Sequence, residues 1–538
     1  MANTAEPALY LSHMGQVPDE TPLIPGRMPL PAALVSAVAG GFVLDSAFPD
    51  RNWWPLAFVG IALILVALPG RRPRSALLVG VLTGISFYGS HIQWVALFLG
   101  PVPITALVLL QALLFAAGCL GITLAYKWLP QVWSGAWGNL LGVPAVVAAV
   151  WCAREAVSST WPYGGFSWGR VAMSQHASPL RESFGWIGIS GVGFAMVFIV
   201  ALALHTARVS TPSRWGAAGR WVAPAVVAAT IVVMPAWPAP QTGTMRVGAV
   251  QGNGPAGYFD DRMPGDLTQA QVDATAPLIG EDLDAVLWPE GATDISPLED
   301  AETAAAFDKI AEGTAAPLIG WGVTNRDGRT YNTEIQWEHG QGAVDFYDKK
   351  HPVPFGEYVP DRAFWRSLAP NLVDMVARDY TPGTTDSIFD VSGVPVGITI
   401  CFDIVDDDVL RQSVAEGAEV LFSSSNNADF GRSDQSAQQL AIAQIRAIEL
   451  GRSVVNISTV GRSAVIASDG SISKELPWHA PGALIADVPL ANSVTPAARW
   501  GGEIETALAV LGFGSLIGAF LVLHRPRLTS RSCHRNVP

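Results

Sequence analysis

Apolar segments, each close to the length of a membrane-crossing helix, recur between residues 29 and 237 and once more near the C-terminus. An α-helix needs ~20 predominantly apolar residues to cross the hydrocarbon core of a bilayer. Half of the 538 residues are hydrophobic and only 15% are charged, so the chain is more apolar than a soluble protein of this length. We therefore predict about eight transmembrane helices, at residues 29–47, 54–70, 76–98, 103–126, 139–157, 185–206, 221–237 and 507–523.

Basic residues in the short loops predict the orientation of these helices, because Lys and Arg concentrate on the cytoplasmic side. The loops that follow the first, third and fifth predicted helices contain only three basic residues: Arg51, Arg170 and Arg181. The prediction places both termini in the cytoplasm and residues 241–500 on the outer face, and a miscounted first helix would move the N-terminus but not that segment. The remaining loops carry the other basic residues: Arg71, Arg72, Arg74, Lys127, Arg208, Arg214, Arg220, Arg525, Arg527, Arg531 and Arg535.

Composition divides the chain into five parts. Residues 1–28 are polar and lack the basic region of a cleaved signal peptide, so we predict a flexible tail. Residues 29–240 are predicted to form a membrane domain with seven helices, and 241–500 a mixed domain of ordinary charge. A last transmembrane helix at 501–524 and a basic cytoplasmic tail at 525–538 follow. The net charge of −13 and the lack of a basic stripe argue against nucleic acid as a partner.

Strands and helices alternate between residues 241 and 500, which is typical of a layered α/β domain with helices covering a sheet. β-Branched apolar runs predict the strands, and a helical period of apolar residues predicts the helices. The predicted strands are 245–251, 285–288, 317–323, 343–349, 394–401, 420–423 and 453–457. The predicted helices are 267–279, 300–312, 408–416 and 434–451.

Cys401 follows a buried strand and precedes an acidic turn that begins at Asp403. A thiol at the end of a strand is well placed to be a nucleophile, although a small buried hydrophobic residue is the alternative. It is the only cysteine between residues 241 and 500, so a disulfide framework is excluded there. A thiol needs a base or a cation to become a thiolate near neutral pH.

Two other stretches of this domain offer such groups. Glu290 ends an apolar strand beside Trp288, where a partly desolvated carboxylate is suited to act as a general base; an acid facing water is the alternative. Lys349 and Lys350 precede a proline-rich, rigid segment that could fix a cation beside Glu357, and solvated lysines are the alternative. No metal-binding motif is present, so we expect no metal and no cofactor.

Taken together, these stretches resemble the nitrilase superfamily, in which Glu, Lys and Cys stand on three successive strand ends. A domain of this kind between the seventh and eighth membrane helices is similar to the apolipoprotein N-acyltransferase family. The matching segments are 250–253, 288–293, 347–357, 401–403 and 444–452. The resemblance implies an extracytoplasmic α/β domain with an αββα sandwich, joined to a polytopic α-helical membrane domain.

The resemblance also implies roles for individual residues. Glu290 is the expected general base, Lys349 the oxyanion stabiliser and Cys401 the nucleophile. Glu357 matches an additional carboxylate of the family, and the backbone N–H of Phe402 is the expected second oxyanion donor. Asp403 is also expected to support the site, although well-known members often have Glu at this position.

The implied reaction takes place at a bacterial cytoplasmic membrane. A phospholipid donates a fatty acyl chain, which passes through a Cys401 thioester to the α-amino group of an N-terminal diacylglyceryl-cysteine of an apolipoprotein. Because both substrates are lipids, residues 363–376 are expected to form a mobile arm that dips into the outer leaflet. An ordinary amphipathic cover of the domain is the alternative. The expected substrate-contacting or membrane-contacting residues are Tyr258, Phe259, Phe364, Trp365 and Leu368.

Two other functions stay open at this point. A membrane-tethered nitrilase or amidase would use the same three residues to hydrolyse a small amide, in an open polar pocket. A scaffold that recruits another membrane enzyme, such as a glycosyl-phosphate synthase, would need no catalytic residues.

Overall fold

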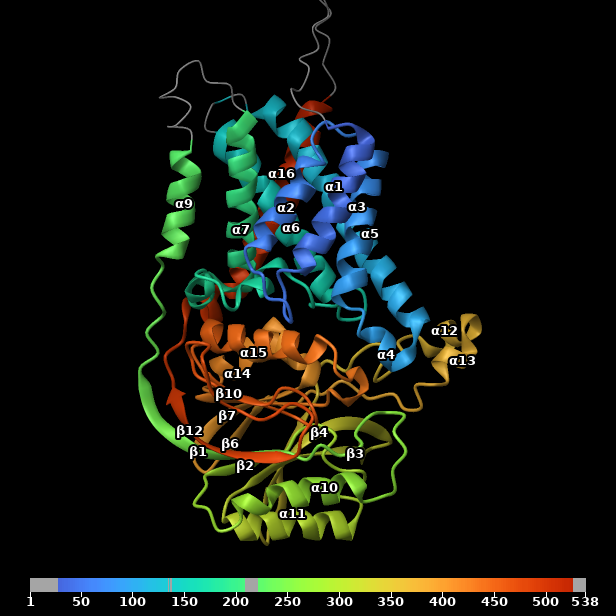
Figure 1. The fold of residues 1–538 in the computed structure, drawn as a ribbon, viewed down its shortest axis with the longest axis vertical. Coiled ribbons are helices and arrows are strands. Elements are labelled where there is room, and N and C mark those ends of the chain that lie inside the picture. The colour runs from blue at the N-terminus through green and yellow to red at the C-terminus, as the bar shows by residue number, and fades with distance from the viewer. Residues whose placement is uncertain (1–27, 134, 136–137, 209–220, 526–538) are drawn as a thin grey trace, which may run out of the picture.

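A computed structural model of the chain describes residues 28–133, 135, 138–208 and 221–525. Two parts stand end to end (Figure 1): a helical bundle made of α1 to α9 and α16, and an α/β sandwich made of β1 to β12 and α10 to α15. The predicted N-terminal tail up to residue 27 and the basic tail after Arg525 lie outside the described residues. So do the predicted cytoplasmic residues Arg214, Arg220, Arg527, Arg531 and Arg535.

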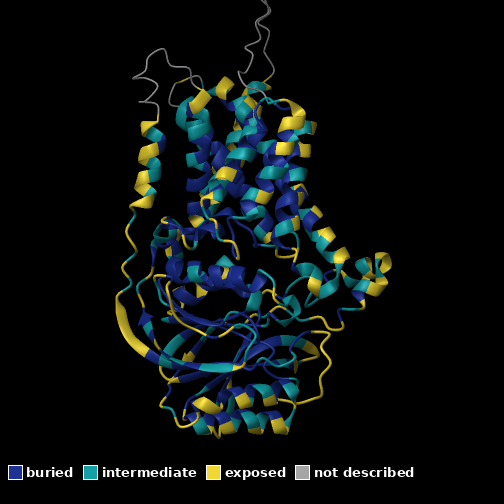
Figure 2. Ribbon diagram, in the orientation of Figure 1, coloured by how far each residue is buried: buried dark blue, intermediate teal, exposed yellow. Residues whose placement is uncertain are grey.

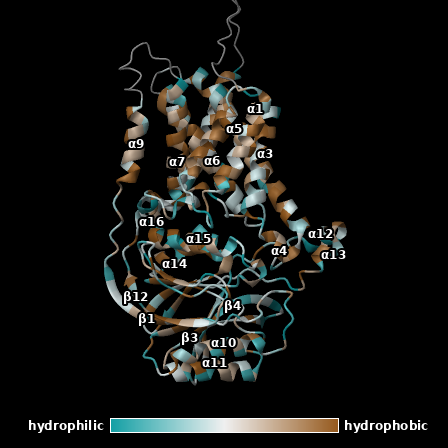
Figure 3. Ribbon diagram, viewed as in Figure 1, coloured by the Kyte–Doolittle hydropathy of each residue, from teal (hydrophilic) through white to brown (hydrophobic). Residues whose placement is uncertain are grey.

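Four described helices are long and apolar enough to cross a membrane, at residues 101–132, 138–160, 181–208 and 496–523. Apolar residues cover their outer surfaces (Figure 3), whereas the packed interior of the bundle is buried (Figure 2). Three other apolar helices have 16, 11 and 11 residues, which is short for a membrane crossing. The helices of the bundle are α1 (Leu30–Asp45), α2 (Leu56–Val66), α3 (Pro73–His91), α4 (Val95–Leu99), α5 (Pro101–Val132), α6 (Val143–Thr160), α7 (Phe184–Arg208), α9 (Val222–Val232) and α16 (Pro496–Leu523).

The predicted helix 507–523 begins earlier, at Pro496, and the predicted helix 103–126 extends to Val132, while two other predicted helices are broken or cut short. The apolar run 76–98 is divided into α3 and the separate helix α4 by a short non-helical stretch after His91. Gly100, with φ of 79°, then ends α4. The run 221–237 forms a helix only as far as Val232, because Pro235 and Pro238 follow and proline cannot continue the hydrogen-bond pattern of a helix.

Small residues allow close packing between α3 and α5. A Cβ atom added at Gly80 would lie 2.4 Å from the Cα of Ala116, and one added at Gly84 would lie 2.4 Å from the Cα of Ala112. Such contacts replace the hydrophobic driving force that is missing between helices in lipid.

Two six-stranded sheets face each other in the sandwich, in the orders β12-β1-β2-β3-β4-β5 and β11-β10-β9-β8-β7-β6. Helices α10 and α11 cover the outer sheet, and α14 and α15 lie between the inner sheet and the bundle (Figure 1). The arrangement is therefore the expected αββα sandwich. The strands are β1 (Gln241–Gln251), β2 (Ala285–Leu287), β3 (Leu318–Arg326), β4 (Arg329–Glu338), β5 (Gly342–Asp348), β6 (Ile388–Val391), β7 (Val394–Ile400), β8 (Val420–Ser425), β9 (Ser453–Ser458), β10 (Ala464–Ile466), β11 (Ile472–Glu475) and β12 (Gly482–Ala491).

The seven predicted strands and four predicted helices of this region are present, with ends shifted by a few residues. The helices are α10 (Asp266–Thr275), α11 (Ala301–Thr314), α12 (Arg362–Leu368), α13 (Pro370–Val373), α14 (Asp407–Ala415) and α15 (Gln435–Leu450). Gly451 adopts a left-handed φ of 64° and ends α15. The pattern missed β4, β6, β10, β11 and β12. In β4 the buried residues include polar ones such as Asn332 and Glu334, so no apolar alternation marks the strand.

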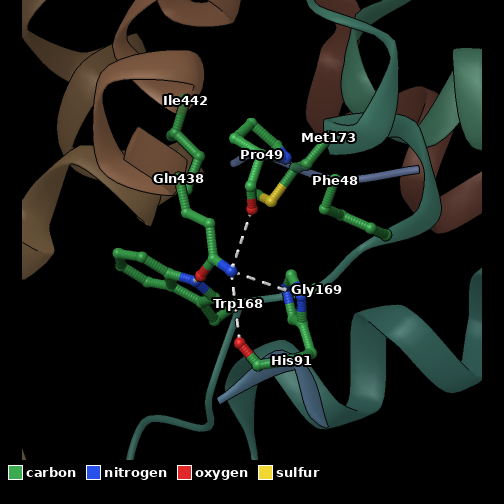
Figure 4. Close-up of a pocket in the computed structure, with 8 residues that line it drawn as sticks. All are labelled: Phe48, Pro49, His91, Trp168, Gly169, Met173, Gln438 and Ile442. Atoms are coloured by element: carbon green, nitrogen blue, oxygen red, sulfur yellow. Dashed lines mark hydrogen bonds between the residues drawn. The ribbon is translucent and has the colours of Figure 1, made fainter. Parts of the chain in front are cut away.

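Gln438 joins the sandwich to the bundle (Figure 4). From the buried face of α15, its Oε1 accepts hydrogen bonds from the indole N–H groups of Trp94 (3.2 Å) and Trp168 (2.7 Å). Its Nε2 donates to the backbone oxygens of His91 (3.2 Å) and Pro49 (3.3 Å). These bonds satisfy the buried amide completely and tie α15 to three separate segments of the bundle.

Candidate active site

Cys401 lies where β7 ends, as the first residue of a short 3₁₀ turn, Cys401–Val405, that we call the nucleophile turn. Its φ is 51°, a left-handed conformation that is strained for a side chain with a Cβ atom and that is often found at functional sites. The ring of Phe402 stacks on Phe166 (5.9 Å between centroids) and Trp168 (6.1 Å), which belong to the bundle. The turn is thus held at the junction of the two parts.

The Cys401 thiol lies beside Glu290, which follows β2 in the opposite sheet. Burial raises the pKa of Cys401 well above its ordinary value; the charge of Glu290 and a hydrogen bond with its carboxylate act in the same direction, and Lys349 opposes them. The free thiol therefore keeps its proton at neutral pH. A reaction at this sulfur needs a base in contact with it, and Glu290 occupies that place.

Lys349 follows β5 and is fully buried between two carboxylates. Its Nζ lies 3.6 Å from Oε1 of Glu290 and 2.9 Å from Oε2 of Glu357. Burial alone would lower the pKa of Lys349, but the charges of Glu290 and Glu357 outweigh burial and hold the pKa well above its ordinary value. The side chain is a fixed cation beside the thiol, the property that stabilises a developing oxyanion.

Asn332 of β4 completes this cluster, and the sequence analysis did not identify it. Its Nδ2 donates to Oε1 of Glu290 and to Oε1 of Glu357, both at 2.8 Å. Its Oδ1 accepts from the indole N–H of Trp321 at 2.6 Å. The amide therefore holds the two carboxylates in fixed positions on either side of Lys349.

Two backbone N–H groups fix the remaining carboxylate oxygens. The N–H of Asn426, just after β8, donates to Oε2 of Glu290 at 2.9 Å. The N–H of Val353 donates to Oε2 of Glu357 at 2.6 Å. Together with Asn332, these groups fix both oxygens of each carboxylate.

Asp403 is the third residue of the nucleophile turn, and its carboxylate connects the turn to β5 and β7. Its Oδ2 accepts from the phenol of Tyr347 at 2.8 Å and from the N–H of Ile400 at 3.2 Å. Burial raises the pKa of Asp403 to about 6. These bonds brace the turn from beneath, which is a supporting position.

Three of the five residues expected to contact lipid, Phe364, Trp365 and Leu368, belong to α12, which lies near α4 (Figure 1), and the other two contact Phe98 of α4. Tyr258 contacts Phe98 of the bundle at 5.8 Å and Phe259 lies 6.3 Å from the same ring. Trp365 packs on Phe355, and its neighbours Phe364 and Leu368 are exposed, at 58% and 65%. Tyr258 also donates hydrogen bonds from its backbone N–H to Asp429 (2.7 Å) and from its phenol to the backbone oxygen of Met375 (3.1 Å), so its loop is joined to other parts of the sandwich as well as to the bundle.

Among the described residues, no group of three or more His, Cys, Asp or Glu side chains is arranged to hold a metal ion. The chemistry available at the cluster is that of a thiol, a base and a cation.

Comparisons with known proteins identify two domain families in the chain. Residues 40–202 match the model of the apolipoprotein N-acyltransferase N-terminal domain, and residues 278–496 match that of carbon-nitrogen hydrolases. An apolipoprotein N-acyltransferase of Mycolicibacterium smegmatis is 34% identical over 94% of this chain and 87% of its own length. One from Azotobacter vinelandii is 28% identical over 89% of this chain and 93% of its own.

Solved structures of the nitrilase superfamily are also similar to the chain. A crystal structure of an amidase from Nesterenkonia aligns with 47% of this chain and 94% of its own, at 16% identity and a TM-score of 0.36. The full-length relatives carry the conclusion: the chain belongs to the apolipoprotein N-acyltransferase family.

Proposed function

We propose that the protein transfers a fatty acyl chain from a phospholipid to the α-amino group of the N-terminal diacylglyceryl-cysteine of an apolipoprotein. The observation that carries this proposal is the cluster of Cys401, Glu290, Lys349 and Glu357 at the junction between the sandwich and the apolar bundle. The similarity to apolipoprotein N-acyltransferases supports the reaction class.

In the first half of the reaction, Glu290 accepts the thiol proton as the sulfur of Cys401 attacks the ester carbonyl of the phospholipid. The negative charge that develops on the carbonyl oxygen is stabilised by Lys349 and by the backbone N–H of Phe402. The ester C–O bond then breaks, and Glu290 returns the proton to the leaving alkoxide. A lysophospholipid departs and a thioester remains on Cys401.

In the second half, the amine of the diacylglyceryl-cysteine attacks the thioester carbonyl. The same oxyanion position is used, and Glu290 accepts a proton from the attacking amine. The C–S bond breaks, and the Cys401 thiolate recovers the proton from Glu290. The enzyme is regenerated and the acceptor carries an amide, so the two substrates react in turn, as in a ping-pong mechanism.

We also propose that residues 29–240 and 501–524 form a membrane domain of about eight helices, with the catalytic domain 241–500 on the outer face and both termini in the cytoplasm. The basic residues in the loops after the second, fourth, sixth and eighth predicted helices support this orientation. The exposed apolar residues Phe364 and Leu368 support an arm that reaches the outer leaflet. In this placement both lipids approach the site along the membrane.

Intact-mass spectrometry of the purified full chain tests the first half of the reaction. After incubation with phospholipid vesicles, the wild type is expected to gain the mass of one fatty acyl chain, sensitive to hydroxylamine. Cys401→Ala is expected to gain nothing. An equal gain in both proteins, or none in a folded wild type, would contradict the thioester.

A synthetic peptide with an N-terminal diacylglyceryl-cysteine tests the second half. Added to the acylated enzyme, it is expected to remove the acyl mass and to gain it at its amine. The same peptide with its amine acetylated is the matched control and is expected to leave the enzyme acylated. Release of free fatty acid with either peptide would instead indicate hydrolysis, as in an amidase.

A further inference from the structure

Glu334 of β4 is a buried acid directly beneath the candidate active site. It lies two residues after Asn332 on the same face of the strand, and none of its surface is exposed. Tyr347 of β5 is its neighbour across the ladder. Ser424 of β8 reaches it from the other sheet, and Ser424 is paired with Ile400, the residue before Cys401.

The surroundings of Glu334 do not support a negative charge. The Ser424 hydroxyl donates a hydrogen bond to its Oε1, while its buried Oε2 has no hydrogen-bond partner among the described residues. Within the part of the chain that the structure describes, Glu334 forms no ion pair, and Lys349 is already paired with Glu290 and Glu357. A buried carboxylate with a single neutral donor is costly, and it avoids that cost by taking up a proton.

We propose that Glu334 is a positioning residue that carries a proton in the active enzyme and thereby limits the negative charge around Cys401. This inference rests on the proposed function, because it concerns the acylation of that thiol. Glu334 lies close enough to Glu290, the base beside the thiol, for the charge of one to act on the other. With Glu334 ionised, Glu290 and the developing oxyanion would meet one more negative charge in a dry site.

The pKa values of Glu334 and of its neighbours define the pH range in which Glu334 loses its proton. Burial, and then the charge of Glu290, raise the pKa of Glu334 to about 8, against the opposing hydrogen bond of Ser424. Cys401, Tyr347 and Lys349 have pKa values raised above their ordinary ranges, so none of them titrates near pH 8. Asp403, with a pKa of about 6, titrates on the acid side.

Acyl-enzyme formation against pH is the first test, with the full-length wild type compared with Glu334→Gln. The amide keeps the shape of the protonated acid and cannot ionise. Between pH 7 and pH 9 the wild-type rate is expected to fall about tenfold, since a group with a pKa near 8 is ~90% protonated at the first value and ~10% at the second. Glu334→Gln is expected to change by less than about twofold.

Glu338→Gln is the matched control, because Glu338 is on the same strand and face but is half-buried and bonded to glutamines. It is expected to keep the wild-type profile. Superimposable profiles for wild type and Glu334→Gln would overturn the proposal. So would a loss of activity at every pH in a folded Glu334→Gln protein, because the charge would then be required.

Infrared spectroscopy tests the proton itself and needs no substrate. At pH 7 the wild type is expected to show a carboxylic-acid C=O stretch that is missing in Glu334→Gln and that disappears from the wild type by pH 9. The absence of this band at pH 7 would overturn the proposal even if Glu334→Gln were unstable. If phospholipid never acylates Cys401, the proposed function fails, while the infrared result still decides the state of Glu334.

Discussion

Replacing Asn332 tests whether the amide between Glu290 and Glu357 sets the geometry of the base. Asn332→Asp is almost isosteric but puts an acceptor where the Nδ2 donor now lies 2.8 Å from each carboxylate. Two hydrogen bonds to charged groups are lost, worth about 1.5 to 3 kcal/mol each. If the whole loss falls on the acylation step, the rate drops by about 10² to 10⁴ at ~1.4 kcal/mol per decade.

The loss is expected to depend on pH in a definite direction. An aspartate between two carboxylates has a raised pKa, so it is neutral at low pH and can then donate to one of them. Asn332→Asp should therefore recover part of its activity as the pH falls. Asn332→Leu has no such donor, and its loss should persist at every pH.

The assay is the rate of acyl-enzyme formation by quenched intact-mass spectrometry, with thermal melting to establish that each variant is folded. Asn325→Asp is the matched control, since Asn325 is exposed near the end of the neighbouring strand β3. It should react at nearly the wild-type rate. A near-normal rate for Asn332→Asp, or equal and pH-independent losses in Asn332→Asp and Asn332→Leu, would refute the reasoning.

Three further changes have defined outcomes. Lys349→Met removes an oxyanion donor and should slow acyl-enzyme formation by about 10² to 10³ in the same assay, without an equal change in phospholipid binding. Arg170 and Asp407 form a buried ion pair at 2.8 Å, so Arg170→Met removes one partner of Asp407 and should cost about 3 to 5 kcal/mol of stability. The melting temperature should fall in Arg170→Met but not in the control Arg181→Met, because the ion pair of Arg181 is partly exposed. Gly80→Leu should prevent the close approach of α3 and α5, because even a Cβ would lie 2.4 Å from Ala116; a normal melting temperature would count against this packing.

Residues that stand at strand ends could be predicted from the sequence. Glu290 and Cys401 each follow a short apolar run that stops at a proline or before an acidic turn, and Lys349 ends the predicted strand 343–349 ahead of a proline-rich segment. The structure brings the three together because strands β2, β5 and β7 belong to facing sheets. The local sequence pattern could not predict that these three residues lie together, and the family resemblance was needed for that expectation.

Residues in the middle of β4 could not be predicted in this way. Asn332 and Glu334 are buried polar side chains in a strand whose sequence reads as polar, so hydrophobic periodicity classes it as a loop. The amide of Asn332 is satisfied by Glu290 and Glu357, and Glu334 receives one hydrogen bond, from Ser424 of β8; all three partners are distant in sequence. A signal that depends on tertiary contacts is absent from any short window of sequence.

The nucleophile turn depends on the bundle as well as on the sandwich. Arg446 of α15 donates to the backbone oxygen of Ile404 at 3.0 Å, and its guanidinium also binds Asp407 at 2.6 Å. Arg170 of the bundle binds the other oxygen of Asp407. The end of the turn is therefore connected to the bundle through two buried guanidinium groups, while stacking holds the ring of Phe402 at its start. A sandwich separated from the bundle would leave Asp407 half-paired and the Phe402 ring uncovered, so the geometry of the thiol is a property of the whole chain and not of its α/β part alone.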